Sequence, residues 1–138
     1  MIRKAAGAVA GIVSAVLTVM ATQWLSHSLY PPPAGLDRSD SEAVATHIAN
    51  APVLALLLVV AGYIIASFDG TLVAAIVGRA KPVAYALLIG LLMLVATTSN
   101  IIMIPHPHWF SASAIIGIIA AAWLASIFAA RILGSDAA

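Results

Sequence analysis

The chain has 138 residues, of which 63% are hydrophobic and only 8% are charged, and its mean hydropathy is +1.10. Soluble domains carry about 25% charged residues, and a soluble fold of this size has too little interior to bury so much apolar surface. Cysteine is absent, which excludes disulfides, thiolate metal sites and cysteine nucleophiles. The formal net charge is only +1 and no long basic run is present, so we expect no nucleic-acid partner. We therefore predict an all-α integral membrane protein, with the lipid bilayer as its solvent.

Four apolar segments are long enough to cross the hydrocarbon core of a bilayer, which takes about 20 helical residues. They predict a single membrane domain over residues 1–138, a four-transmembrane-helix bundle with spans at about 5–27, 52–78, 83–104 and 110–133. The first segment follows two cations, as the apolar core of a signal peptide also does. Its apolar run is longer than the ~7–15 residues of a signal peptide. We expect an uncleaved first helix, and a cleaved signal is the alternative.

Residues 28–51 form an outer loop between the first two predicted spans. Three consecutive prolines, beginning with Pro31, are expected to end the first helix. Ser39 and Glu42 have the spacing of a capping box, which predicts a short helix from about Asp40. This helix is amphipathic, so we expect it to lie on the membrane surface between spans one and two.

The distribution of cations predicts the orientation of the bundle. With four spans, most Lys and Arg residues fall on the side of the two termini, namely Arg3, Lys4, Arg79, Lys81 and Arg131. Arg38 alone falls on the other side. Because cytoplasmic loops carry the excess of Lys and Arg, we expect both termini in the cytoplasm. The small size and simplicity of the chain favour the bacterial inner membrane.

The second span contains the carboxylate Asp69, about 15 Å inside Arg79 if the helix is regular. The whole span would be about 42 Å long. A helix of this length must tilt and protrude, or else break, and Asp69-Gly70 is the natural place for a break. A charge at the bilayer centre costs roughly 2.5–3.5 kcal/mol. Asp69 is therefore either a proton- or cation-linked group, or a structural acid that caps a helix break or is bonded to Ser67, Thr71 or another helix.

Small residues recur at every fourth position of the second span, which places them on one helix face: Gly62, Ala66, Gly70, Ala74 and Gly78. The fourth span has a similar stripe that includes Gly117. In lipid, helices associate through close backbone contact, so these stripes predict tight packing. The packing is either within the bundle or with a second copy or a larger membrane complex.

The four histidines fall on the predicted outer side: His27, His47, His106 and His108. With nearby acids they are weak candidates for a zinc or copper site, although their spacing matches no metal motif. A pH-sensing role is a second interpretation, and ordinary interfacial histidines are the third. Asn100, in the third span, is expected to bond another helix, and the alternatives are that it lines a polar entrance or binds a lipid head group.

No nucleotide loop, metalloprotease motif, nucleophile elbow or paired-carboxylate arrangement is present. We therefore expect no catalytic residues and no cofactor. The leading hypothesis is a structural or accessory membrane protein that acts through close helix contacts. The alternatives are a small proton- or cation-linked transporter or channel that uses Asp69, and an outward-facing protein that binds a metal or a lipid head group.

Overall fold

The structure is a computed structural model that describes residues 1–135. Its helices are α1 Ile2–Leu29, α2 Ser41–Ala49, α3 Val53–Gly78, α4 Pro82–Met103 and α5 His108–Ser135. The four long helices are apolar and long enough to cross a membrane, and the short α2 lies between the first two of them. The predicted all-α fold with four spans and one short intervening helix is therefore confirmed.

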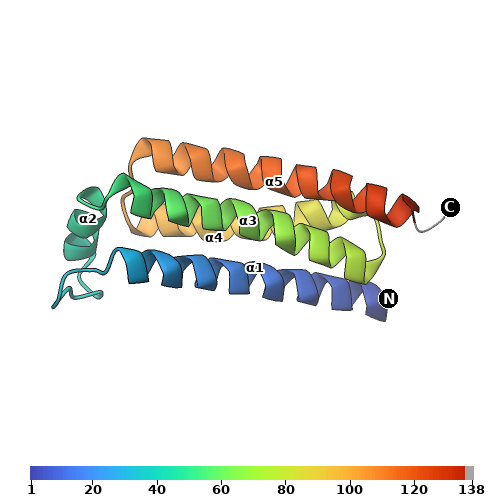
Figure 1. Cartoon of the computed structure of the whole chain (residues 1–138), viewed down its shortest axis with the longest axis horizontal. Coiled ribbons are helices and arrows are strands. Elements are labelled where there is room, and N and C mark those ends of the chain that lie inside the picture. The colour runs from blue at the N-terminus through green and yellow to red at the C-terminus, as the bar shows by residue number, and fades with distance from the viewer. Residues whose placement is uncertain (136–138) are drawn as a thin grey trace.

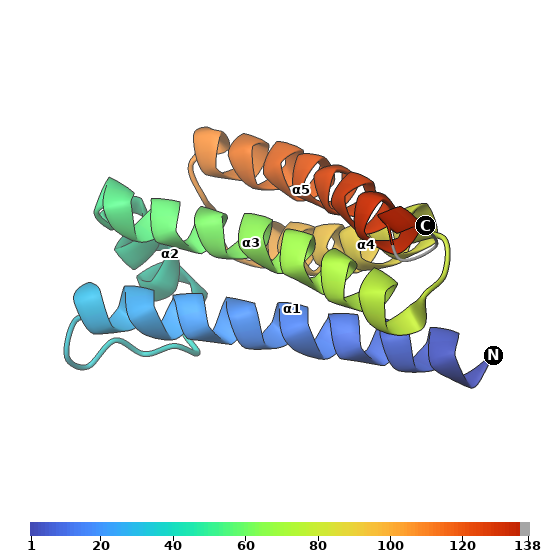
Figure 2. The same ribbon diagram turned by 45° about the vertical axis from the view of Figure 1, so that its right-hand side comes forward.

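The central element of the bundle is α3, which packs against each of the other three long helices. Figures 1 and 2 show α1 along one side of α3, with α5 and α4 on its other sides. The principal contact of α1 is with α3. Both described ends of the chain lie at one end of the bundle, and α2 crosses the opposite end (Figure 1). We call these two ends the terminal end and the α2 end.

The helix α3 is continuous through Asp69 and Gly70, so the break considered from the sequence does not occur. Gly70 is covered by Gly11 and Ala15 of α1, and this packing leaves no space for the helix to open there. The helix ends instead at Gly78, and its C-cap residue Arg79 has a left-handed φ of 42°. Its 26 residues span about 39 Å, so the helix must tilt or protrude from a ~30 Å core.

The residues that begin α2 differ from the predicted capping box. Asp40 is the N-cap, and its carboxylate accepts hydrogen bonds from the backbone N–H groups of Glu42 and Ala43 at 2.9 and 3.2 Å. The Ser39 hydroxyl instead donates to Asp37 at 2.6 Å. The choice of Ser39 as the cap was therefore wrong by one residue. Asp and Ser are about equally good N-caps, and here the Ser39 hydroxyl is already engaged with Asp37, so the Asp40 carboxylate serves as the cap.

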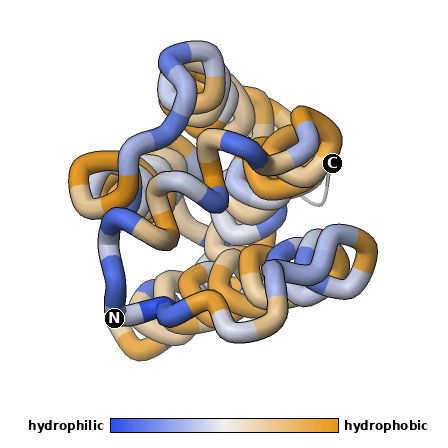
Figure 3. The backbone as a smooth tube through the Cα atoms, turned by 90° about the vertical axis from the view of Figure 1, so that its left-hand side faces the viewer, coloured by the Kyte–Doolittle hydropathy of each residue, from blue (hydrophilic) through white to orange (hydrophobic). Residues whose placement is uncertain are grey.

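The core of the bundle contains two clusters of buried side chains. The one nearer the α2 end is formed by Leu56, Val60, Tyr63, Phe110, Ala114 and Ile118. The other, nearer the terminal end, is formed by Ala74, Ala75, Tyr85, Ile89 and Ala129. Many large apolar side chains are exposed on the outer faces of the long helices. In Figure 3 the helices are mostly coloured as hydrophobic and the hydrophilic colour gathers in the connecting segments, as expected for a bundle surrounded by lipid.

Candidate functional site

A cavity of about 570 Å³ lies at the α2 end of the bundle. Its walls come from the end of α1, the proline-rich loop, α2, the start of α3 and the connection between α4 and α5. This volume lies within the range of about 300–1,000 Å³ that is typical of small-molecule sites. We call it the α2 cavity. Its apolar wall includes Leu56, Val59, Ile104 and Phe110.

The polar groups of the α2 cavity are contributed by residues far apart in the sequence. They are Ser26, His27, Tyr30, Arg38, His47 and His106. Ser26 is buried and its hydroxyl donates to the carbonyl oxygen of Ala55 at 3.4 Å, which joins α1 to α3 beside the cavity. The cavity therefore combines an apolar wall with a small set of polar groups, as ligand pockets usually do.

Two of the imidazoles are held by backbone carbonyls. The Nδ1 atom of His106 lies 2.6 Å from the carbonyl oxygen of Ile104, and that of His27 lies 2.7 Å from the carbonyl oxygen of Gln23. A carbonyl oxygen only accepts, so each Nδ1 carries a hydrogen and Nε2 is the nitrogen left for another partner. The His106 ring also stacks on Phe110, with centroids 4.4 Å apart. Burial lowers the pKa of His106 below its ordinary value.

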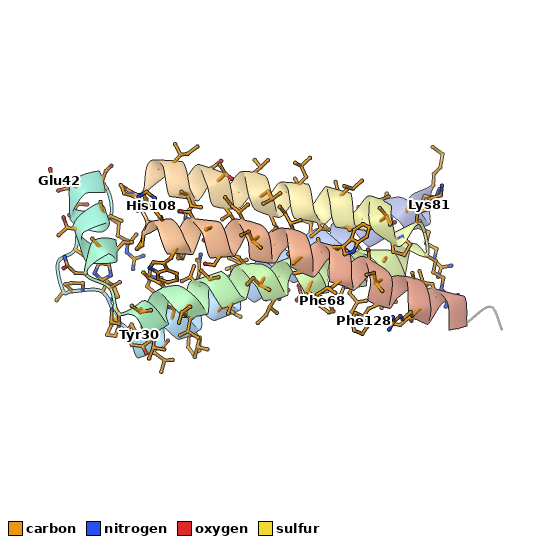
Figure 4. All side chains as sticks on the ribbon, turned by 90° about the horizontal axis from the view of Figure 1, so that it is seen from above. Tyr30, Glu42, Phe68, Lys81, His108 and Phe128 are labelled. Carbon is orange, nitrogen blue, oxygen red and sulfur yellow. The ribbon has the colours of Figure 1, made fainter. Side chains whose placement is uncertain are left out.

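Around the α2 cavity, the Arg38 cation has no bonding partner within the described chain, whereas two nearby carboxylates do. Arg38 lines the cavity, and the structure gives its guanidinium no hydrogen bond or ion pair among residues 1–135. Neighbouring carboxylates are engaged elsewhere, because Asp37 accepts from Ser39 and Asp40 caps α2. The Ser39 hydrogen bonds, from its side chain and then its backbone, lower the pKa of Asp37. Glu42 lies on a different cavity, and Figure 4 places it at the far tip of α2.

The histidines do not form a metal centre in the described part of the chain. His27, His47 and His106 line the same cavity, yet no group of three or more His, Asp or Glu residues there lies close enough to hold a metal ion. His108 begins α5 and is exposed, and it is outside the cavity lining. The geometry therefore gives the predicted metal site no support, although it does bring three of the four histidines together.

Asp69 lies at the interface of α3 and α1. Its Oδ2 atom accepts hydrogen bonds from the Thr18 hydroxyl at 2.5 Å and from the Ser14 hydroxyl at 3.4 Å. Its Oδ1 atom is buried and has no hydrogen-bond partner within the described chain. Its partners thus come from a neighbouring helix and not from Ser67 or Thr71, the two residues of its own helix that the sequence offered. Ser67 donates instead to the carbonyl oxygen of Ile118 on α5, at 2.9 Å.

Asn100 joins two helices. Its side-chain nitrogen donates to the hydroxyl of Tyr63 on α3 at 3.3 Å. Both residues also line a groove of about 320 Å³ between α1 and α4, together with Gln23 and Thr97. An interhelical hydrogen bond in a membrane contributes about 0.6 kcal/mol on average, so this contact is a modest stabilising link.

The small residues of α3 are in contact with the rest of the chain. A Cβ atom added to Gly70 or Gly62 would meet α1, at Ala15 and Thr22 respectively. One added to Gly78 would collide with Tyr85 of α4. Ala66 and Ala74 are completely buried, and Gly117 of α5 packs against Ile64. These residues are therefore used for packing within the bundle, and contact with a partner is not needed to explain them.

Comparison with known proteins assigns no function, because the chain matches no protein-family model, no curated protein and no solved structure. The candidate site is therefore identified from the geometry of the structure. Sequence reasoning did not identify Ser14 and Thr18 as partners of Asp69, although their four-residue spacing beside Gly11 and Ala15 places them along one side of α1. It also missed Arg38 as a cavity residue, because no sequence signal shows which way a loop side chain faces.

Proposed function

We propose that this small integral membrane protein binds a small amphipathic molecule in the α2 cavity. The observation that carries the proposal is the cavity itself, about 570 Å³ in volume, with an apolar wall and a limited set of polar groups at the end of a membrane bundle. This combination suits a ligand that has both an apolar and a polar part. The proposal develops one hypothesis drawn from the sequence, that the protein binds a lipid head group, and it does not include the metal that was the other part of that hypothesis.

The orientation of the chain is part of the proposal. Arg3, Lys4, Arg79, Lys81 and Arg131 would face the cytoplasm of a bacterial cell, and the protein would lie in the inner membrane. The α2 cavity would then open on the outer side of the membrane, at the level where lipid head groups lie. An amphipathic ligand would reach it from the outer leaflet or from the aqueous phase beyond.

Filling the cavity tests the proposal. Ala51 lines the cavity and packs against the core, so Ala51→Trp places a large side chain where the ligand would lie. Ala49 is exposed at the end of α2, which makes Ala49→Trp the matched control. Each protein is placed in phosphatidylcholine nanodiscs with a panel of single-chain amphiphiles, namely oleate, monoolein and lysophosphatidylcholine, and bound ligand is measured by native mass spectrometry.

We expect at least one amphiphile to bind the original protein saturably at one molecule per chain. Ala51→Trp should lower this binding at least tenfold, and Ala49→Trp should leave it unchanged. Binding that is equal in both variants, or absent from all three proteins for the whole panel, would contradict the proposal.

A second candidate function, proton- or cation-linked transport, is favoured by one observation at Asp69. The Oδ1 atom of this carboxylate is buried without a hydrogen-bond partner in the described chain, so it is available to a proton or a cation. Asp69→Asn keeps an acceptor for Thr18 and Ser14 but removes the charge. If the candidate is correct, proton flux into proteoliposomes falls to the level of empty liposomes. Flux unchanged from the original protein would exclude it, and Asp37→Asn in the exposed loop is the control.

The accessory hypothesis remains a prediction. The small-residue stripes that motivated it are occupied by contacts within the bundle, so a partner complex would have to use another surface.

A further inference from the structure

The α2 cavity has a cation on its wall, the Arg38 side chain, although acidic residues outnumber it in the surrounding segment. Three acidic residues lie close to Arg38 in the sequence, namely Asp37, Asp40 and Glu42, and no Asp or Glu lines the cavity. Asp37 and Asp40 accept hydrogen bonds from their own loop and helix, and Glu42 lies on the second cavity. The permanent charge on the cavity wall is therefore that of the Arg38 guanidinium.

Arg38 lacks an internal partner, since no hydrogen bond or ion pair to it occurs among residues 1–135. A guanidinium carries five N–H donors in a planar fork that matches the oxygens of a carboxylate or a phosphate. The Nε2 atoms of His27 and His106 are the ring nitrogens that remain after Nδ1 has bonded a backbone carbonyl. In a neutral imidazole that donates through Nδ1, Nε2 only accepts a hydrogen bond, so these two nitrogens suit an O–H group of a ligand. The Arg38 guanidinium is the group of the cavity lining that suits an anionic oxygen.

The rest of the cavity wall is apolar and firmly packed. Phe110 is completely buried, stacks on His106, and packs edge-on against Tyr63 with ring centroids 6.4 Å apart. Leu56 and Val59 of α3 continue this wall. An alkyl chain placed there would be removed from water, which is favourable in proportion to the apolar area buried.

We infer that the ligand of the α2 cavity is an anionic single-chain amphiphile, with a carboxylate or phosphate head group at Arg38 and its alkyl chain against the partly exposed side chains of Val59 and Ile104. This inference rests on the proposed function and adds the charge and class of the ligand. The volume of the cavity suits one chain, and the charge of its wall suits an anion. α2 lines the site with Val44, His47 and Ile48, none of which is fully buried.

The test compares head groups on one chain length in phosphatidylcholine nanodiscs. The probes are oleate, lysophosphatidic acid with an oleoyl chain, and monoolein as the neutral counterpart, with inorganic phosphate alone as the fourth. We expect both anions to bind at least tenfold more tightly than monoolein, a ratio that corresponds to about 1.4 kcal/mol. Free phosphate should bind far more weakly than lysophosphatidic acid, because it lacks the chain. Free phosphate that binds as tightly as lysophosphatidic acid would overturn the assignment of a chain-bearing ligand.

Substitution of the cation gives the second arm of the test. Arg38→Gln should weaken binding of the two anions about three- to tenfold and leave monoolein unchanged, since an exposed charge interaction is of modest strength. Arg38→Lys keeps the positive charge, so it should weaken binding of the two anions less than Arg38→Gln does. Arg131→Gln removes the same charge from the terminal end and is the matched control. Anion and monoolein affinities that are equal and insensitive to Arg38 would overturn the inference while leaving the proposed function intact. Failure of every amphiphile to bind would overturn the proposed function itself.

Discussion

At the scale of single residues, this protein places its few polar groups in defined contacts. Asp69 is bonded by two hydroxyls of α1, and Asn100 is bonded to Tyr63 across two helices. His106 is held between the Ile104 carbonyl and the face of Phe110. In a bilayer an unsatisfied polar group is expensive, so these contacts fix the rotation of each helix relative to its neighbours.

Burial of His106 predicts a pH dependence of stability. Burial lowers the pKa of this residue in the folded protein, whereas the unfolded chain keeps a pKa near 6.5. As the pH falls through about 6.5 the unfolded state takes up the proton first, so this contribution to stability is lost on the acid side. We expect the thermal midpoint in detergent to fall between pH 7.5 and 5.5.

The variant that tests this dependence is His106→Asn, whose side-chain N–H is able to replace the hydrogen bond to Ile104. The fall in its thermal midpoint with pH should be smaller than in the original protein. The control is His108→Asn, which removes an exposed imidazole two residues away. Identical pH profiles for the original protein and His106→Asn would show that burial of this imidazole has no effect on stability.

At the scale of the helices, glycine and alanine determine how the bundle is assembled. Gly7 and Gly11 of α1 lie against Ala74, Gly78 and Gly70 of α3, and a Cβ atom on Gly7 would come within 2.6 Å of the Ala74 carbonyl oxygen. Backbones approach this closely only where side chains are absent or very small. The hydrogen bond from Tyr85 to the Lys4 carbonyl oxygen, 3.0 Å long, then ties α1 to α4 at the terminal end.

Gly11→Ala should separate α1 from α3. The added methyl group would collide with the Gly70 carbonyl oxygen and the Ala74 side chain, so we expect a loss of about 1–3 kcal/mol in the free energy of unfolding. Gly134→Ala is the matched control because its added methyl group would meet nothing within 4 Å. The free energy of unfolding of both variants is measured by SDS unfolding in mixed micelles. Equal stability of the two variants would refute the close-contact explanation.

At the scale of the whole molecule, the two ends of the bundle differ in character. The α2 end has a cavity with polar groups from four separate segments of the chain, and the terminal end has a closely packed glycine interface and most of the cations. The proposed ligand site at one end and the cations at the other suit a protein that has one orientation in the membrane. This orientation is a prediction from the charge distribution.

The absence of cysteine makes the orientation simple to test. Ala34→Cys places one thiol in the exposed proline-rich loop, and Gly134→Cys places one at the exposed end of α5. In intact cells we expect a membrane-impermeant maleimide to label Ala34→Cys and not Gly134→Cys. After the cells are permeabilised both should react, and the reverse pattern in intact cells would invert the proposed orientation.

The fold class followed from local properties of the sequence. Hydropathy over about 20 residues identifies each span, and the prolines at Pro31 and Pro105 mark two of the breaks between helices. The boundaries differ from those predicted by a few residues, since α1 begins at Ile2 and α5 at His108. The continuity of α3 was left open by the sequence, because Asp69-Gly70 suits both a break and a close helix contact.

The candidate site was only partly accessible from the sequence. The assignment of four spans placed all four histidines at the same end of the predicted bundle, but their grouping around one cavity without His108 depends on how the loop, α2 and the turn before α5 fold together. The unpaired state of Arg38 depends on which acids find other partners. Both are properties of contacts between segments far apart in the chain.

The sequence by itself determined that this is an all-α membrane protein with four spans and a short helix after the first, because lipid requires long apolar helices with internally satisfied backbones. Only the tertiary structure decided that α1 lies against α3, that Thr18 and Ser14 bond Asp69, and that Arg38 faces a cavity with His106. The physical reason is that hydropathy is uniform around these helices. In lipid, helix pairing is therefore selected by backbone approach and by a few hydrogen bonds, which become defined only when the segments meet.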